Sequence, residues 1–486
     1  MGIKSYQMSQ TSVKELSNNY QKLRWIKRII TLFVGITIWH LPVPWDLSPD
    51  AWHLFAIFIT AIIGVLINAL SIFTASVLAL VAVVITRVLT PEQAFSGFSE
   101  SLILLILAAF LVAKGVIKSG LGRRIAFLLI RRFGKSTLNL GYCIVATDTL
   151  LGPAIPSNTA RSGILYPITH ALSLDTGSLP TTESRKKTGS YLMMTAISGH
   201  TISSALWFTG MAANPVGAGI AAQFGVNMNF GNWVFVASVP CIIALIAIPL
   251  VLYKLFPPEI KYTPEAPEMA KNALHEMGPM SKQEWIMGIT FFGMILLWAF
   301  SPVLNINLAI VAFLGLSILI LANVYTLEDI RQGAGDALET YVWFAILYMM
   351  STALNDMGFM KTLGAQIATH ISDYNWVTVY ILLTVLYVVI HYLFVSQTAH
   401  LLALYAVFLQ VGVNAQVPAA LMAFMLSFAT NYFAVITPQA SSSNVLFAGS
   451  GFLPSEDIYK QGAIITVLNM VIFLLATPWI IWSSSL

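Results

Sequence analysis

Long apolar stretches separated by short polar connections run along almost the whole chain. Eleven of them approach the length of about 20 apolar residues that a helix needs to cross a membrane. They lie at Trp25–Leu41, Ala51–Leu70, Ser71–Val88, Ser101–Ile117, Tyr191–Gln223, Trp233–Leu255, Glu284–Pro302, Asn305–Val324, Tyr341–Met357, Val417–Phe447 and Gly462–Trp482. The pattern predicts an all-α polytopic membrane protein with eleven transmembrane helices.

Two further apolar regions, Leu138–Leu172 and Trp376–Gly412, are interrupted in the middle by a polar turn. If each region were one straight helix, the amide and basic side chains of its turn would lie in lipid. If each region were two separate transmembrane helices, each helix would be too short to cross the membrane. A re-entrant helical hairpin that enters and leaves on one side satisfies both constraints. The two turns, 239 positions apart, are Pro156-Ser157-Asn158-Thr159-Ala160-Arg161 and Val395-Ser396-Gln397-Thr398-Ala399-His400.

The basic residues indicate an orientation. With the N-terminus inside, most of the 25 Lys and Arg residues fall on inside connections, as the positive-inside rule requires. The C-terminus is then outside, and the hairpins open to opposite sides of the membrane. Spans two to six and seven to eleven therefore form units of opposite orientation, so we predict inverted repeats. Gly120 precedes Ser157 by 37 residues and Gly358 precedes Ser396 by 38, which agrees with a repeat.

The predicted domains follow from these repeats. They are a cytoplasmic tail and first span (1–50), a first repeat (51–255) with the hairpin 138–172, a cytoplasmic linker (256–283), and a second repeat (284–486) with the hairpin 376–412. The tail lacks the pattern of a signal peptide and is not an arginine-rich, acid-poor transit peptide. This favours a bacterial plasma membrane.

Composition agrees with the membrane class. Hydrophobic residues make up 57% of the 486 positions and charged residues 9%, against roughly 25% charged in a soluble domain. The net charge of +4 is scattered over short connections, so no nucleic-acid partner is predicted. Cys143 and Cys241 both fall in apolar segments and are expected to be free thiols.

Two polar breaks in apolar spans, Thr209–Pro215 and Thr437–Asn444, follow the hairpins. Helix N-termini at the hairpin tips suit a carboxylate, whereas freed carbonyls and hydroxyls suit sodium. Paired breaks in two halves indicate a secondary transporter with its site between the repeats. The predicted substrate-binding residues are Ser157, Asn158, Thr159, Thr209, Asn214, Pro215, Ser396, Gln397, Thr398, Thr437 and Pro438. No catalytic residue or cofactor is predicted; the candidate sodium ligands are Ser157, Asn158, Ser396 and Thr398.

With these tips and breaks, the chain resembles the divalent anion:sodium symporter family, which carries di- and tricarboxylates. The resemblance extends over nearly the whole chain. The turns and the segment from Gly120 to Ile125 are most similar to the 2-oxoglutarate/malate translocators and citrate/succinate exchangers. The resemblance implies eleven spans with two re-entrant hairpins, a homodimer, and elevator movement of a transport domain against a scaffold. The expected substrate is a small di- or tricarboxylate.

The chain departs from the sodium-coupled pattern of this family. Gln397 stands where sodium-coupled relatives usually carry Asn, and Arg161 and His400 follow the two tips, 239 positions apart. Fixed positive charge there can replace a bound cation. A carrier without substrate would then have to move an uncompensated charge back through the membrane, which is unfavourable. We therefore predict exchange of dicarboxylates, with sodium-coupled di- or tricarboxylate symport as the alternative. Structural roles stay open: Arg161 pairing with Asp148, His400 as a packing residue, and the tip hydroxyls as helix caps.

Other classes are disfavoured. The string Gly333-Ala334-Gly335-Asp336 matches intramembrane aspartyl proteases, but Asp336 lies among polar residues and not within a span. No base is evident beside the hairpin serines, as an intramembrane serine hydrolase would need. No Walker A string occurs, which leaves ATP-driven transport unsupported. A channel would need a continuous polar stripe, whereas polarity here is concentrated at two tips and two breaks.

Overall fold

The structure, a computed structural model, describes residues 10–371 and 373–485. Within these residues the chain forms 24 α-helices joined by turns and five short 3-10 helices. Six segments are long and apolar enough to cross a membrane: Pro49–Leu66, Ser101–Ser119, Phe230–Leu255, Gly335–Asp356, Trp376–Leu393 and Ser455–Leu475. The fold is therefore all-helical and polytopic, as predicted.

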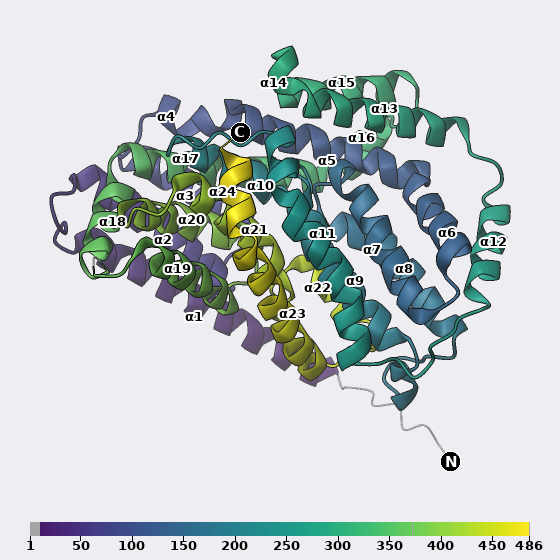
Figure 1. Ribbon diagram of the computed structural model, residues 1–486. Helices are drawn as coiled ribbons and strands as arrows, with labels where there is room; N and C mark the ends of the chain where they lie inside the picture. The colour runs from purple at the N-terminus through teal and green to yellow at the C-terminus, as the bar shows by residue number, and fades with distance from the viewer. Residues whose placement is uncertain (1–9, 372, 486) are drawn as a thin grey trace. The chain divides into compact units, whose positions relative to one another are not determined.

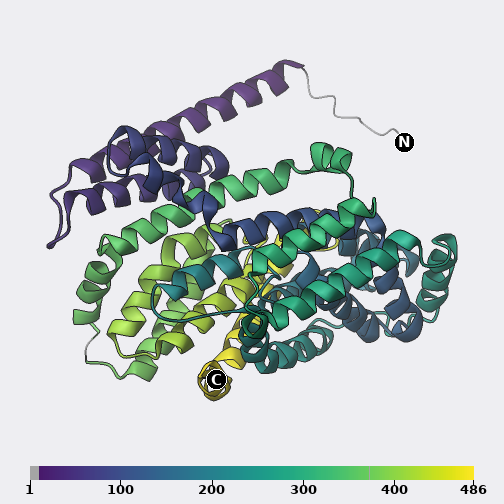
Figure 2. The same cartoon turned by 90° about the horizontal axis from the view of Figure 1, so that it is seen from above.

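The chain divides into two compact units. One runs to Gly97 and includes Val342–Thr362. It holds α1 (Gln10–His40), α2 (Pro49–Leu66), α3 (Ile72–Ile85) and α4 (Pro91–Phe95). Helix α1 lies along α2, which lies along α3 (Figure 2, purple). The indole of Trp52 donates to the carbonyl of Ile38 at 2.9 Å, which ties α2 to α1.

The other unit contains Phe98–Tyr341 and the chain from Leu363 onward, and it holds both hairpins. The first consists of α7 (Thr137–Leu151), a 3-10 turn (Gly152–Ala154) and α8 (Asn158–Asp175); the second of α19 (Trp376–Ile390), a 3-10 turn (His391–Leu393) and α20 (Gln397–Asn414). Each element begins and ends 239 positions after its counterpart, so the hairpins repeat residue for residue.

Each hairpin packs on a helix that stops short. Helix α9 (Gly189–Leu206) contacts both α7 and α8, side by side in Figure 1, and the chain then turns into α10 (Ala213–Ala222). In the same way α21 (Ala419–Tyr432) contacts α19 and α20 and ends in a 3-10 turn (Phe433–Val435) before α22 (Ser442–Ala448). The two polar breaks predicted from the sequence are therefore real interruptions of helix.

The remaining helices recur in the two halves of the chain. Both ends of α13 (Lys282–Ala299) lie 233 positions after those of α2, and both ends of α15 (Leu308–Leu321) lie 236 after those of α3. Gly120 (φ 80°) separates α5 (Ser101–Ser119) from α6 (Leu121–Phe133), and Gly358 (φ 79°) precedes α18 (Phe359–Thr369). The left-handed backbone at both sites favours glycine. This recurrence supports a repeat, whose boundaries at 51–255 and 284–486 stay a prediction.

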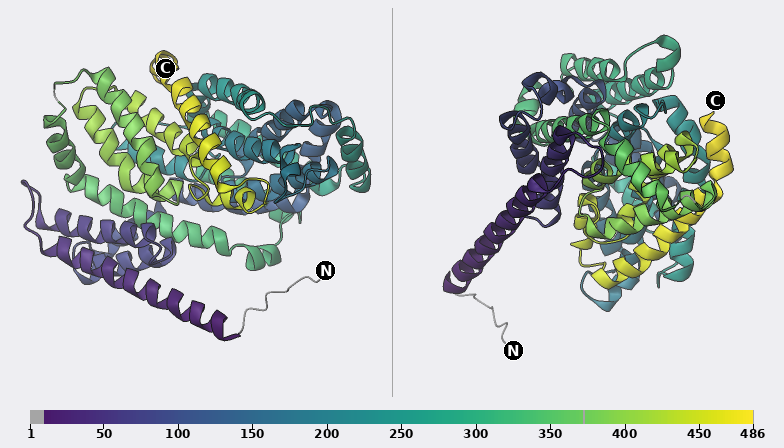
Figure 3. Two further views of the ribbon diagram at one scale, coloured as in Figure 1. Left: turned by 90° about the horizontal axis from the view of Figure 1, so that it is seen from below. Right: turned by 90° about the vertical axis from the view of Figure 1, so that its left-hand side faces the viewer.

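Six further helices lie elsewhere in the described chain. They are α11 (Phe230–Leu255), α14 (Ser301–Leu304), α16 (Leu327–Gly333), α17 (Gly335–Asp356), α23 (Ser455–Leu475) and α24 (Thr477–Ser484). The predicted span Gly462–Trp482 is thus two helices, divided just before Pro478, which occupies a first-turn position of α24. Helix α24 lies against α11, where Trp479 donates to the carbonyl of Val236 at 3.0 Å (Figure 3).

Several short helices were not predicted, among them α4, α16, α18 and two that pack together. Helix α6 carries four arginines, and α12 (Ala266–Glu276) lies in the segment expected to be a linker; the two pack against each other. Both are amphipathic and short, so a search for long apolar stretches passes over them. The tail also differs, because α1 continues without a break from Gln10 through the predicted first span.

A buried ion pair joins α6 to the linker. The Arg124 guanidinium donates to both carboxylate oxygens of Glu284, at 2.5 and 3.1 Å, and to the carbonyl of Gly278 at 3.0 Å. Glu284 also accepts from the backbone N–H of Ser281, in a capping box that begins α13. The pair thereby fixes where the linker ends and α13 begins.

We expect Glu284→Gln to destabilise the protein by about 3 kcal/mol, because removing one partner of a buried pair leaves an uncompensated charge. The measurement is the melting temperature of the purified protein in detergent. Glu268→Gln, at an exposed position of α12, is the matched control and should melt like the wild type. Equal melting temperatures for all three proteins would contradict this role of the pair.

Candidate functional site

The two hairpin tips meet. Asn158 and Gln397 are the first residues of α8 and α20, and the Asn158 amide donates to Gln397 Oε1 at 3.2 Å. The hydroxyls of Ser157 and Ser396 accept from the backbone N–H groups of Ala160 and Ala399, at 3.2 and 3.3 Å. The tip serines therefore cap these helices, and the two N-termini direct their partial positive charges at one place.

The first break lies against the first tip. The N–H of Ala212 donates to the carbonyl of Pro156 at 3.0 Å, and the Thr209 hydroxyl donates to the carbonyl of Pro153 at 2.9 Å. The hydroxyl of Thr209 is thus engaged with the hairpin's 3-10 turn. Thr159, which is exposed, shares a hydrogen bond of 2.7 Å with Ser442 at the start of α22. The first tip therefore contacts the breaks of both halves.

The second tip is fixed in a related way. The Gln397 amide donates to the carbonyls of Thr430 and Asn431, at 2.9 and 3.3 Å, where α21 ends. Asn431 in turn donates to Asn214 Oδ1 at 2.8 Å, which links the end of α21 to the first break. Thr398 is half-buried one residue beyond Gln397.

Asn214 and Asn444 hold the two breaks closed. Asn214 donates to the carbonyls of Ser204 and Trp207, and Asn444 donates to those of Ala434 and Thr437. In each case the acceptors lie 10 and 7 residues before the asparagine. The breaks therefore correspond at an offset of 230.

That offset pairs Thr437 with Trp207, so Thr437 and Thr209 do not occupy equivalent positions. The Thr437 hydroxyl is buried without a partner among the described residues. Pro215 lies in the first turn of α10, where a missing N–H costs nothing, and Pro438 is half-buried between η5 (Phe433–Val435) and α22.

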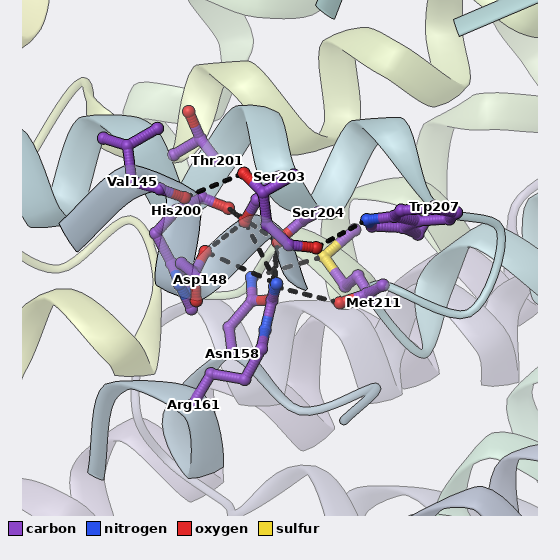
Figure 4. A network of polar contacts seen from close by, with 12 residues as sticks. Val145, Asp148, Asn158, Arg161, His200, Thr201, Ser203, Ser204, Trp207 and Met211 are labelled. Atoms are coloured by element: carbon purple, nitrogen blue, oxygen red, sulfur yellow. Dashed lines mark hydrogen bonds and ion pairs between the residues drawn. The ribbon is translucent and has the colours of Figure 1, made fainter. Parts of the chain in front are cut away.

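Arg161 lies at the centre of a buried polar network in the first half (Figure 4). Its guanidinium donates to Asp148 Oδ2 at 3.4 Å, to Asn158 Oδ1 at 2.9 Å and to the carbonyl of Gly210 at 3.0 Å. It also donates to the hydroxyls of Ser203, at 3.0 Å, and Ser204. Arg161 therefore connects the first tip, the first break and α7, and it orients the amide of Asn158.

Asp148 balances this charge. Its Oδ2 also contacts His200 Nδ1 at 3.0 Å and accepts from the hydroxyl of Ser203. Asp148 and Arg161 are both fully buried, so their attraction is strong but is offset by desolvation. With Asp148 ionised, the pair has no net charge. The pairing that sequence reasoning left open is present, and the Arg161 side chain contributes mainly placed donors.

Three residues of this network were missed. His200, Ser203 and Ser204 lie at i, i+3 and i+4 on α9, so they share one face of the helix. A polar face on an otherwise apolar helix next to a predicted hairpin was the signal that could have found them.

In the second half the corresponding positions carry neither a guanidinium nor a carboxylate. His400, the counterpart of Arg161, contacts His391 with 3.2 Å between their Nδ1 atoms, and His391 Nε2 lies 3.1 Å from the carbonyl of Ala440. Ala440 is the counterpart of Gly210, so the same carbonyl accepts from a basic side chain in both halves. Tyr387 replaces Asp148, and its hydroxyl shares a hydrogen bond of 2.9 Å with Thr430, the counterpart of His200.

The donor set gives no support for a transition-metal site: among the described residues, no three His, Cys, Asp or Glu side chains lie close enough to hold a metal ion. Oxygen atoms that would suit a hard cation do gather in the first half, at Asn158, Ser204 and Gly210. The Arg161 guanidinium already lies among them.

Asp336 lies outside this arrangement. It is in the first turn of α17, its side chain is 79% exposed, and it pairs with Lys114 at 3.2 Å. An aspartyl protease needs its catalytic carboxylates together in a buried site, so the Gly-x-Gly-Asp string has no catalytic role here.

The chain resembles known transport proteins. Residues 22–485 match the family model of the sodium:sulfate symporter transmembrane region. Dicarboxylate transporter 2, chloroplastic, of Spinacia oleracea is 38% identical over 92% of this chain and 80% of that protein. The L-tartrate/succinate antiporter of Escherichia coli (strain K12) is 31% identical over 94% of this chain and 98% of that protein.

A solved structure has a similar fold. Neisseria gonorrhoeae MtrF, described as belonging to a class of antimetabolite efflux pumps, aligns with a TM-score of 0.57. The alignment covers 95% of this chain and 94% of MtrF at 14% sequence identity. At this identity the similarity concerns the fold alone.

We expect Asp148→Asn to destabilise the protein by about 3–5 kcal/mol, because the buried Arg161 guanidinium loses its carboxylate. The double variant Asp148→Asn with Arg161→Gln should be less destabilised than Asp148→Asn alone, since it removes the unpaired charge. Melting temperatures in detergent measure both effects, with exposed Asp175→Asn as the control. If the loss of stability in the double variant equalled the sum of the losses in Asp148→Asn and Arg161→Gln, the two residues would not be coupled.

Proposed function

The chain belongs to the sodium:sulfate symporter family, a family of transporters and not of enzymes, and from this premise we propose that it exchanges dicarboxylates across a membrane. The proposed substrates are of the 2-oxoglutarate, malate and succinate type. We place the protein in a bacterial plasma membrane, with its N-terminus in the cytoplasm and its C-terminus outside.

The observation that carries the proposal is the meeting of the two hairpin tips. Helices α8 and α20 each begin with an amide side chain at this point, and these two side chains are in contact. An aligned helix presents free N–H donors and about half a positive charge at its N-terminus, which favours an anion. Two such ends at one place suit a ligand with two carboxylates better than a ligand with one.

Fixed basic side chains favour exchange over sodium symport. In a symporter the coupling cation binds and leaves with the substrate. Here the Arg161 guanidinium holds the first tip to the first break, among oxygens that a cation would otherwise need as ligands. In the second half His391 binds the corresponding carbonyl, and His400 contacts His391. The name of the E. coli relative, an antiporter, agrees with exchange.

Arg161 adds little net charge to the site, because the carboxylate of Asp148 offsets the charge of its guanidinium. The difficulty of returning empty then arises from the two helix N-termini at the tips, whose free N–H donors lose their anionic neighbour when the substrate leaves. We propose that the carrier moves through its barrier more readily with a dicarboxylate bound than without one.

The larger mechanism is also a proposal. Eleven spans, two re-entrant hairpins and inverted repeats would form a homodimer in which the hairpins, with α9, α10, α21 and α22, move together as an elevator. The contacts of each hairpin with its broken helix support a common moving body, because tips and breaks are hydrogen-bonded to one another.

Sodium-coupled symport is the alternative. The tip serines keep lone pairs beyond their capping bonds, Thr398 adds a hydroxyl, and the family is named for sodium. This alternative predicts transport that depends on a sodium gradient.

The test is uptake of labelled succinate into proteoliposomes, with and without internal succinate or 2-oxoglutarate, in sodium and in sodium-free buffer. We expect uptake at least about tenfold faster with internal dicarboxylate and no dependence on sodium. Sodium-driven uptake into empty vesicles would overturn exchange in favour of symport, and absence of any dicarboxylate uptake would overturn both.

The tips can be tested separately. Asn158→Ala and Gln397→Ala should each raise the half-saturating dicarboxylate concentration at least about tenfold, which corresponds to about 1.4 kcal/mol of binding free energy. Asn139→Ala, on the exposed start of α7, is the control. Unchanged half-saturation in both tip variants would remove the tips from the site.

A further inference from the structure

We infer that the first unit of the chain binds an anionic phospholipid of the bilayer. The headgroup phosphate lies at Arg28, and an acyl chain lies in an apolar groove between α1 and α3. This site goes beyond the proposed function, because it shares no residue with the hairpins or the breaks. In the proposed orientation of the chain, the lipid belongs to the cytoplasmic leaflet.

The groove has a volume of about 610 Å³ and is lined by residues of α1, α2 and α3, all in the first unit. Helix α2 packs against both of the others, so it lies at the base of the groove. On α1 the lining residues recur three and four positions apart from Arg28 to His40, which places them on one face of the helix. This length of helix rises about 18 Å, which exceeds half of a hydrocarbon core of about 30 Å. The groove is therefore long enough for an acyl chain of one leaflet.

The lining of the groove is apolar between its two ends. Three threonines line it, but the hydroxyls of Thr31, Thr60 and Thr86 donate to carbonyls four residues earlier in their own helices, at 2.9, 2.5 and 2.7 Å. The other lining residues between Arg28 at one end and Trp39 and His40 at the other are Gly, Ala, Leu and Ile. A surface of this kind gains free energy when a hydrocarbon chain covers it.

Arg28 lies at one end of the groove, in a fixed position. Its Nε–H donates to the carbonyl of Ala69 at 3.2 Å, and its guanidinium lies over the ring of Trp25, 4.9 Å from the centroid. The hydrogen bond uses the Nε–H alone, which leaves the Nη donors for a ligand, and the guanidinium fork matches the oxygens of a phosphate. Tryptophan is enriched at the membrane–water interface, so this end of the groove fits the depth of the headgroups.

The N-terminus of α3 lies beside Arg28. Ala69, which accepts from Arg28, comes three positions before Ile72, the first residue of α3. Ser71 caps the helix, because its hydroxyl accepts from the backbone N–H of Thr74 at 3.2 Å. A helix N-terminus carries partial positive charge and free N–H groups, which favour a phosphate. Guanidinium and helix end therefore act on an anion at the same end of the groove.

Basic side chains gather at this end of α1. Three of them lie within about two turns of Arg28, namely Lys22, Arg24 and Lys27. The sequence has no Asp or Glu in residues 16–45 or 51–91, which include the connection from α2 to α3. Basic side chains next to a membrane span attract lipids with a net negative headgroup. The site therefore favours a lipid such as phosphatidylglycerol over a zwitterionic lipid, although both carry a phosphate.

The test is native mass spectrometry of the purified full chain in detergent, titrated with phosphatidylglycerol or with phosphatidylcholine of the same acyl chains. We expect the wild type to bind phosphatidylglycerol at least about fivefold more tightly than phosphatidylcholine, because the surplus of basic side chains favours the anionic headgroup. The melting temperature in detergent should rise more with phosphatidylglycerol, since a ligand that binds the folded protein stabilises it.

Two pairs of variants test the headgroup and the groove separately. Arg28→Gln should weaken phosphatidylglycerol binding at least about fivefold, because the phosphate loses its guanidinium. Arg331→Gln, at an exposed position of α16, is the matched control. Ala82→Phe fills part of the groove and should weaken the binding of both lipids, whereas Val81→Phe, at an exposed position outside the groove, should leave it unchanged. Melting temperatures without added lipid show whether each variant is folded.

Equal affinity of the wild type for both lipids would overturn the inference, as would unchanged phosphatidylglycerol binding in folded Arg28→Gln or in folded Ala82→Phe. The rival occupant of the groove is a second copy of this chain. If Ala82→Phe changed the oligomeric state, measured by light scattering, but not the lipid affinity, the second copy would replace the lipid. All of these outcomes leave dicarboxylate exchange in place, because uptake into proteoliposomes tests it separately.

Discussion

Every backbone group that is freed where a helix stops inside an apolar core needs a partner from the protein, because no water is at hand to supply one. This chain stops helices at four such places, and the rest of the site depends on how the freed groups are satisfied. Asn214 and Asn444 each bind two carbonyls of the preceding helix end. Arg161 and His391 each bind one further carbonyl, at Gly210 and Ala440. The side chains that look like ligand-binding residues are thus first the residues that make the breaks possible.

This requirement explains why the halves agree in geometry but differ in charge. A carbonyl accepts equally well from a guanidinium or an imidazole, so either satisfies the same backbone. A guanidinium brings a permanent charge, which then needs Asp148, and Asp148 needs the donors of His200 and Ser203. A neutral imidazole needs no carboxylate, and Tyr387 and Thr430 take those positions. One choice of donor therefore determines several neighbouring residues in each half.

The sequence predicted the features that depend on hydropathy and on short polar turns. Both hairpins, their offset of 239 and both breaks could be located because polar residues interrupt apolar stretches there. The amphipathic helices α6 and α12 could not, because a short helix with charged residues contains no long apolar stretch. The register of the breaks was also beyond reach. It depends on hydrogen bonds to carbonyls, which carry no side-chain signature, so the sequence did not show that Thr437 corresponds to Trp207.

The contact between Asn158 and Gln397 shows what the two halves share. These residues are counterparts at an offset of 239, and they contact each other directly. In a structure built from two related halves, a residue can meet its own counterpart only near the axis that relates the halves. The contact of Asn214 with Asn431 joins the first break to the end of α21, whose carbonyls bind Gln397. A ligand held between the tips would therefore contact both halves at once. Behind one tip lies a guanidinium paired with a carboxylate, and behind the other lie two imidazoles, so the two carboxylates of the ligand would not be equivalent even if the ligand itself were symmetric.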